Sequence, residues 1–558
     1  MKKIIFTFLM VLLLPVMIYA QFTGGNYGGD ISSALNGKHL TNWFKTAGNW
    51  STASNWDDGV LPASSEDAYI KAAAVIDNDY SYPNLAISVA GSVTISPAKS
   101  LTVTGTLTNN AGTGGLAIQS SGSGTGSLIH STASVNATVQ RYIADAIWTT
   151  WDDGWHFLSS PVSAQAINPA FTVTPEAEYD FYTWYEPENV WVNFKNTSTA
   201  PTWGTANNAS TNFLVGKGYL VAYKTASTKT FTGVLNVGNV SYSNLTVSSG
   251  VNNSWHLLGN PFTSAVTWDL TGAWAKTAIG GVANIWDEVG KSYQAINDGD
   301  IIPSGNGFMV YVSSSTNSIT IPASKRTHSL EAWYKSTEYP VVTLVAKNLD
   351  NPSYQECQVR FNPVSTSDFD LEYDGKYLAG YAPLFYSMSN GDKLMVNSMP
   401  VLNSQTSVPF SFIKNNGTSF VIETLFTDNF PNSVYLKDLK TGIDQNLIQD
   451  PVYNFTSVEG DNPARFLLHF GGLIGLEEKP DEDPVRIYAS GHTLIINSLT
   501  GSILEGKVTI FNFLGQRVLT RSLDKNQSNR IALDGLDGYF LVKLINNKQI
   551  YSTKVLIH

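Results

Sequence analysis

The sequence predicts an all-β, multidomain protein, and three observations carry this prediction. Only 14% of the 558 residues are charged while 12% are aromatic, so solubility must come from hydroxyl and amide groups, as in extracellular β structure with many turns. Short alternating apolar runs recur along the chain, separated by Gly, Asn, Asp and Pro. The chain also exceeds the size of one hydrophobic core, so we expect about three to five domains.

The N-terminus predicts a signal peptide over residues 1–20. Two lysines precede an apolar run over 4–18, and small, polar positions follow at Ala20 and Gln21, between which we expect cleavage. The run is shorter than the roughly 20 residues that span a bilayer, and Pro15 interrupts it. We therefore expect the Sec translocon as a partner and a mature chain without a transmembrane helix.

Residues 21–145 are rich in Gly, Ser and Thr and hold short strand-like runs such as Val93–Ser96 and Leu101–Leu107. The phrase Gly48–Pro62, followed by Asp67–Ile70, resembles the opening of β-solenoid-like stretches in bacterial surface and adhesin proteins. Such a segment stacks short strands as rungs that bury one side against their neighbours. An ordinary small β-sandwich is the alternative.

Residues 146–328 contain an internal repeat, which predicts tandem β modules over about 146–245 and 246–328. The matching phrases are Trp155-His-Phe-Leu-Ser-Ser-Pro161 and Trp255-His-Leu-Leu-Gly-Asn-Pro261, the strands around Trp184 and Trp286, and the turns Gly216-Lys-Gly218 and Gly305-Asn-Gly307. Glycines at such turns permit backbone angles that other residues resist.

The repeated tryptophans, Trp155, Trp184, Trp255 and Trp286, have two interpretations. Indole rings can stack on the apolar faces of sugars, which makes these four residues candidate glycan-binding platforms. Repetition at matching positions favours the other interpretation, in which they form the core of each module. The repeated His156 and His256 are expected as polar edge residues rather than as a metal pair.

Residues 329–475 predict a further β-sandwich, because strand-like runs alternate with Asn, Asp, Gly and Pro clusters. Its one cysteine, Cys357, excludes an intramolecular disulfide and is expected as a buried thiol. This stretch resembles a module that often precedes the sorting domain of large secreted Bacteroidetes proteins. An acidic segment with two prolines follows over 476–484 and predicts an extended linker.

The last 74 residues, 485–558, contain seven short strand-like runs, which predict a small immunoglobulin-like β-sandwich. The wording from Val508 to Val518, then Gly538-Tyr539 and the closing run from Lys554, resembles the type A C-terminal sorting domain of the type IX secretion system. The resemblance implies that the type IX machinery is a partner and that Gly515, Gly538, Tyr539 and Lys554 are motif residues. Many members of that family separate this glycine and tyrosine by one residue.

Charge and motifs narrow the functional classes. A net charge of −11 gives no basic field for phosphates, so nucleic acid is not an expected partner. We find no metalloprotease, nucleophile-elbow or phosphate-loop motif. We expect no cofactor. Acidic turns such as Asp57-Asp58-Gly59 could offer carboxylates to a structural calcium ion, but none has the twelve-residue calcium-loop spacing, so turn formation is the favoured explanation. Paired carboxylates of a hydrolase would have to come from the cluster around the aromatic strands, which contains Glu176, Glu178, Glu186, Glu188, Asp287 and Glu288.

We therefore expect a non-catalytic protein, delivered by way of the periplasm to the cell surface or the medium, that serves in adhesion, matrix building or glycan binding. A secreted polysaccharide-acting hydrolase and a purely structural surface component are the alternatives. The sequence names no ligand.

Overall fold

A computed structural model describes residues 42–148, 153–249, 253–270, 272–329, 340–400, 406–426, 430, 433–470, 485–512, 516–533, 535–546 and 549–557. Strands dominate these ranges and form several separate sheets, which confirms the predicted multidomain all-β fold. The helical turns are short: α1 (Trp203–Ala206), η1 (Ala53–Asn55), η2 (Gly112–Gly115), η3 (Glu176–Glu178), η4 (Glu186–Glu188), η5 (Gly272–Trp274) and η6 (Ala323–Lys325). The predicted cleavage site at Ala20 and Gln21, the acidic linker and Gly515 lie outside the described residues.

The first described segment is a β-solenoid, as the sequence predicts. Its strands are β1 (Asn42–Phe44), β2 (Gly48–Asn49), β3 (Ala68–Ile70), β4 (Ala73–Ile76), β5 (Tyr80–Tyr82), β6 (Leu85–Ile87), β7 (Ser92–Ile95), β8 (Ser100–Val103), β9 (Leu107–Asn109), β10 (Leu116–Ile118), β13 (Ser127–His130) and β14 (Asn136–Ile143), with the hairpin β11 (Ser120–Ser121) and β12 (Gly124–Thr125). Successive strands visit three parallel sheets in turn, β1-β3-β6-β9, β2-β4-β7-β10-β14 and β5-β8-β13, so the chain coils in rungs.

Aliphatic side chains in register hold the rungs together. Ile76, Ile95 and Ile118 are direct neighbours along one sheet and are fully buried. The first rung is closed by Trp50 and Trp56, whose indoles are 0% exposed. Trp56 Nε1 donates to the Trp50 carbonyl oxygen at 2.9 Å. These are the repeated Asn-Trp pairs of the sequence phrase, and they cover an end of the solenoid whose parallel strands would otherwise expose apolar surface.

The two predicted modules have the same strand order. In the first, β15 (His156–Leu158), β16 (Tyr179–Tyr185), β17 (Val190–Asn193) and β18 (Tyr219–Tyr223) form the sheet β15-β18-β16-β17. In the second, β21 (Trp255–Gly259), β23 (Ala283–Asp287), β24 (Ser292–Ile296) and β26 (Gly307–Tyr311) form β21-β26-β23-β24. The remaining strands are β19 (Ser227–Val234), β20 (Val240–Ser243), β22 (Ala265–Thr267), β25 (Ile301–Ile302), β27 (Ser318–Ile321) and β28 (Arg326–Thr327).

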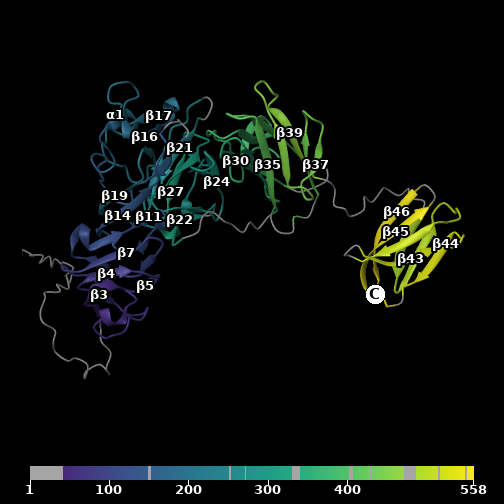
Figure 1. The fold of residues 1–558 in the computed structure, drawn as a ribbon, viewed down its shortest axis with the longest axis horizontal. Helices are drawn as coiled ribbons and strands as arrows, with labels where there is room; N and C mark the ends of the chain where they lie inside the picture. Colours follow the sequence, from purple (N-terminus) through teal and green to yellow (C-terminus); the bar gives the residue numbers. More distant parts are fainter. Residues whose placement is uncertain are drawn as a thin grey trace, which may run out of the picture.

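The modules attach to the solenoid in different ways. β19 of the first module pairs antiparallel with β14 over their full lengths, and one apolar cluster runs from Phe44 to Leu235. The second module has its own core around Trp268 and Trp274. It contacts the solenoid through Thr263, which exchanges hydrogen bonds with the backbone of Leu128. Figure 1 shows β19 and β14 side by side at this join.

A third region consists of β29 (Val341–Asn348), β30 (Tyr354–Phe361), β31 (Gly375–Lys376), β32 (Leu384–Ser389), β33 (Asp392–Met399), β34 (Ser407–Ile413), β35 (Ser419–Phe426), β36 (Val434–Asp438), β37 (Asp444–Asn446), β38 (Val452–Thr456) and β39 (Ala464–Phe470). They form one 11-stranded sheet around a large apolar cluster, and a smaller cluster holds Tyr377, Tyr386 and Met395. Phe412 of β34 packs on Phe420 and Phe455 of β35 and β38, so distant parts of this sheet face each other across the core. Cys357 is fully buried there, as predicted.

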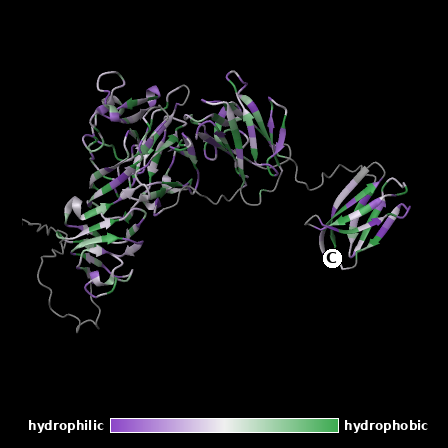
Figure 2. Cartoon of the chain, viewed as in Figure 1, coloured by the Kyte–Doolittle hydropathy of each residue, from purple (hydrophilic) through white to green (hydrophobic). Residues whose placement is uncertain are grey.

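The C-terminal module has the seven predicted strands. They are β40 (Val485–Ser490), β41 (Thr493–Ser498), β42 (Lys507–Phe511), β43 (Arg517–Ser522), β44 (Ser528–Ala532), β45 (Gly538–Asn546) and β46 (Gln549–Ile557). The sheets β40-β41-β44 and β43-β42-β45-β46 enclose one apolar cluster, which confirms the sandwich. Figure 2 shows hydrophobic residues concentrated on the strands of every region.

Candidate functional site

The most informative junction in the molecule lies between the two repeated modules, where each copy inserts its Gly-x-Gly turn against the other. The Gly259 amide donates to the Gly216 carbonyl oxygen at 2.6 Å, and the Ser159 amide donates to the Gly305 carbonyl oxygen at 2.8 Å. Ser159 directly follows β15 and Gly259 ends β21, the equivalent strands of the two copies, so the contacts are reciprocal. The repeat therefore forms a pair of mutually docked modules.

The two glycines of each turn have different tasks. The first, Gly216 or Gly305, has a φ of +76° or +61°, which L side chains disfavour. The second, Gly218 or Gly307, lies against the partner module. A Cβ on Gly218 would stand 2.5 Å from the Leu258 carbonyl oxygen, and one on Gly307 would stand 3.1 Å from the Phe157 Cβ. Turn geometry, which the sequence predicts for all four glycines, therefore explains only the first of each pair, and the second serves close packing.

Equivalent carboxylates also cross the junction. Glu186 and Glu288 each lie two residues after the repeated tryptophan of their own copy. The Ser254 amide donates to Glu186 Oε1 at 3.0 Å, and the Gly154 amide donates to Glu288 Oε1 at 2.6 Å. Ser254 and Gly154 directly precede the Trp-His strands, so each copy binds the start of the other copy's first strand.

The settings of these two carboxylates differ. Burial raises the pKa of Glu186, but hydrogen bonds from the Ser248 hydroxyl and amide and the Ser254 amide outweigh it and hold the pKa below its usual value. Burial raises the pKa of Glu288 to about 7, because hydrogen bonds from the Gly154 amide and the Trp286 side chain only partly compensate. Glu288 is therefore partly protonated near neutral pH.

The four repeated tryptophans gather at this junction. Trp255 is 2% exposed and belongs to an apolar cluster that holds Phe157 from the first copy and Tyr293 from the second, with Trp184 and Trp286 packed against it. Trp184 Nε1 donates to the Trp255 carbonyl oxygen at 2.7 Å. Trp155 is half-buried, with its ring edge-on to Tyr182. The structure thus places these rings between the modules rather than inside each one.

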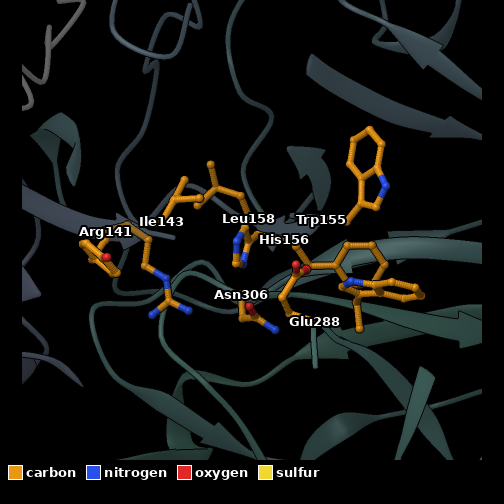
Figure 3. A pocket seen from close by; sticks show the side chains of 10 residues that line it. Arg141, Ile143, Trp155, His156, Leu158, Glu288 and Asn306 are labelled. Carbon is orange, nitrogen blue, oxygen red and sulfur yellow. The ribbon is translucent and has the colours of Figure 1, made fainter. Parts of the chain in front are cut away.

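A cavity of about 60 Å³ lies beside the cluster and is lined by Arg141, His156, Glu288 and Asn306 together with Trp155 and Trp286. Figure 3 shows Arg141 and Glu288 toward opposite sides of this view, with His156 and Asn306 between them. Burial, with the field of Arg141, lowers the pKa of His156 to about 4, so its imidazole is neutral in the folded protein. The cavity is far smaller than the roughly 300–1,000 Å³ of small-molecule sites.

The other candidate residues take ordinary structural roles. Asp57 Oδ1 accepts the Trp43 amide at 2.7 Å, and the Asp57 amide donates to the Trp43 carbonyl oxygen at 3.0 Å, so this carboxylate holds two chain segments together. Within the described ranges no three His, Cys, Asp or Glu side chains are grouped as metal ligands. No helix among the described residues has the length and apolar character that crossing a membrane requires.

Two of the motif residues in the C-terminal module contact each other. Lys554 Nζ lies 4.2 Å from the ring centroid of Tyr539, and Tyr539 is 56% exposed. Gly538, immediately before it, has a φ of +108°, which favours glycine. The sequence could not place the glutamate pair or the docked turns, because both require knowing that the two copies face each other.

Comparison with known proteins assigns most of the chain to one family. A family model described as "Domain of unknown function (DUF8693)" matches residues 43–299 and 282–470. The chain belongs to this family. The match to DUF8693 takes in the solenoid, both repeated modules and the third region, and the C-terminal module lies beyond it.

Two further similarities are more distant. The "Minor fimbrium subunit Mfa5" of Porphyromonas gingivalis is 29% identical over 133 residues, which are 23% of this chain and 10% of that protein. The matched segment thus spans about a tenth of the length of this curated relative. A solved "Biofilm associated protein - BSP domain" is 10% identical and covers 77% of this chain and 97% of its own, with a TM-score of 0.11, which carries no structural argument.

Proposed function

We propose that this chain is a non-catalytic protein of the bacterial surface or its extracellular matrix, with a structural or adhesive role. The observation that carries the proposal is the mutual docking of the repeated modules. The rings and carboxylates that could have formed a binding or catalytic cleft are used to join one β module to the next. Similarity to a segment of a minor fimbrium subunit supports the surface setting.

Adhesion through glycans is the finer part of the proposal. Trp255 offers no free face, so a stacking surface would have to use the more exposed Trp155 or rings elsewhere on the chain. A glycan array with the purified protein tests this directly. Saturable binding that Trp155→Ala weakens supports a lectin-like role, and absence of binding to any glycan favours a purely structural component.

We propose that export has two steps. The signal peptide directs the first, across the inner membrane, and the C-terminal module directs the second, through the type IX machinery. The exposed Tyr539–Lys554 contact supports a surface that another protein can recognise. Deleting residues 485–558 should leave a folded protein in the periplasm, because this module has its own core. Fractionation and protease accessibility of intact cells measure the outcome, and the full-length chain in the same strain is the control. Normal surface delivery of the truncated chain would contradict the proposed route.

A further inference from the structure

A second cavity, of about 180 Å³, lies between the solenoid and the second module. Thr125 of β12 and Ser127 of β13 line one wall. Ala265 and Ser304 of the second module line the other. Arg141 of β14 also lines it. One water molecule needs about 10–15 Å³ of such space, so the cavity has room for a small anion and several waters.

Arg141 occupies an unusual position in its strand. In β14 the alternate residues Ala137, Val139 and Ile143 are buried, and Arg141 falls in the same inward series. Burial lowers the pKa of this guanidinium. Within the described residues its side chain makes one hydrogen bond, from Nη1 to Thr125 Oγ1 at 3.2 Å, and no ion pair. A guanidinium carries five N–H donors, so this one hydrogen bond leaves most of them available to a ligand or water in the two cavities that Arg141 lines.

Elsewhere the chain satisfies its buried arginines. Arg465, in the third region, donates from Nε and Nη2 to the two carboxylate oxygens of Asp438 at 3.1 and 2.8 Å. Arg326 donates to the backbone carbonyls of Ala323 and His130. Arg141 is partly shielded from solvent and has no such carboxylate or carbonyl partner among the described residues, so an anion or ordered water would complete its hydrogen bonds.

The charges around Arg141 favour an anion. No Asp or Glu lines the larger cavity among the residues described, and hydroxyl groups supply its polar wall. Lys229 is directly opposite Arg141 in β19, but its ammonium lies over the Tyr223 ring and does not line the cavity. In Figure 3, His156 and Asn306 lie between Arg141 and Glu288, the acid that lines the smaller cavity.

We infer that the larger cavity is a binding site for a small oxyanion, with Arg141 as its charged ligand. A sulfate, a phosphate or a carboxylate matches the planar fork of the guanidinium through two parallel hydrogen bonds. Thr125 and Ser304 line the same space. Their hydroxyl groups bond Ser120 Oγ and the Phe262 carbonyl oxygen in this structure, so they would have to rotate to contact the anion. The source is either a free anion or the acidic group of a sugar, because both present the same oxygen atoms.

Titration calorimetry of the full chain at constant ionic strength tests the site, with sulfate, phosphate, glucuronate, neutral glucose and chloride as probes. We expect saturable binding of at least one oxyanion and none of glucose. Arg141→Gln should weaken it by about tenfold or more, the loss of one charge-assisted contact. Lys224→Ser, which removes an exposed cation of the first module that does not line the cavity, should leave it unchanged. Tighter sulfate or phosphate binding identifies a free anion, and tighter glucuronate binding an acidic sugar.

The inference is overturned if no oxyanion binds saturably or if Arg141→Gln binds as the original chain does. If that variant fails to fold, Ala265→Val provides the decision, because it narrows the cavity from the second module and leaves Arg141 in place. Unchanged anion affinity in Ala265→Val would then also overturn the site. The readout is anion affinity alone. It therefore does not depend on the outcome of the deletion and glycan-array experiments that test the proposed function.

Discussion

The two repeated modules have the same strand order, yet equivalent residues in them have different surroundings. Glu186 receives more hydrogen bonds than Glu288, so their pKa values shift in opposite directions. Trp255 is fully covered while its counterpart Trp155 is half-buried. The first module shares its core with the solenoid, and the second has its own. A duplicated sequence thus fixes the strand order, whereas neighbours determine burial and charge.

The largest expected difference between the copies concerns the tryptophans. Trp255→Ala should destabilise the docked pair by about 3–5 kcal/mol, because it removes a fully buried indole from a cluster that includes side chains of both copies. Trp155→Ala should cost about 1–2 kcal/mol, since a half-buried ring loses less apolar contact. Chemical denaturation with tryptophan fluorescence measures both variants. Equal losses would show that the junction is as symmetric in energy as in strand order.

Substituting the second glycine of each Gly-x-Gly turn should also destabilise the two copies by different amounts. Gly218→Ala brings a methyl group against a backbone oxygen at 2.5 Å, which cannot move alone, so we expect a loss of about 2–3 kcal/mol. Gly307→Ala meets only side-chain carbon at 3.1 Å, and we expect about 1 kcal/mol or less. Thermal unfolding of the two variants provides the test. A larger effect at Gly307 would contradict the packing assigned to these turns.

The glutamate pair predicts opposite pH effects. Between pH 4.5 and about 7 the folded protein holds a proton on Glu288 that the unfolded chain has released, so this group makes stability fall as the pH rises. Glu288→Gln keeps the acceptor for Gly154 and removes the charge, and it should stabilise the protein at pH 8 by about 1–2 kcal/mol after allowance for solvent screening.

Glu186→Gln is the matched control for this pH experiment. The folded-state pKa of Glu186 lies below its usual value of 4.5. The ionised carboxylate therefore stabilises the folded protein above pH 4.5, and this stabilisation disappears as the pH falls through the folded-state pKa. The variant should therefore be less stable than the original chain at pH 8. Denaturant midpoints measured from pH 4 to 8 decide between the two signs. Destabilisation by Glu288→Gln at pH 8 would refute the contrast.

The smallest effect is expected on the surface. Lys224 pairs with Glu178 at 3.1 Å in the first module, and the second module has Ser313 at the equivalent position. Lys224→Ser should change the unfolding free energy by no more than about 0.5 kcal/mol, because solvent screens an exposed ion pair. The same denaturation assay measures it. A loss as large as that of Gly218→Ala would mean that this edge belongs to the docked junction.

Local sequence patterns determined much of this molecule. Alternation and turn residues determined the strands of the C-terminal module, and the Asn-Trp phrase predicted the solenoid that Trp50 and Trp56 close. The repeat determined a common strand order for the two modules. These features depend on residues close in sequence or on a motif that recurs, so one chain is enough to reveal them.

Only the tertiary structure decided how these units meet. The docking of Gly218 against Leu258, the opposite settings of Glu186 and Glu288, and the enclosure of Arg141 all join segments that are far apart in the sequence. A side chain's burial and pKa depend on every atom within a few ångströms, including those of other modules. Since alternation specifies only which face of a strand a residue occupies, it could not say that one inward position faces a cavity.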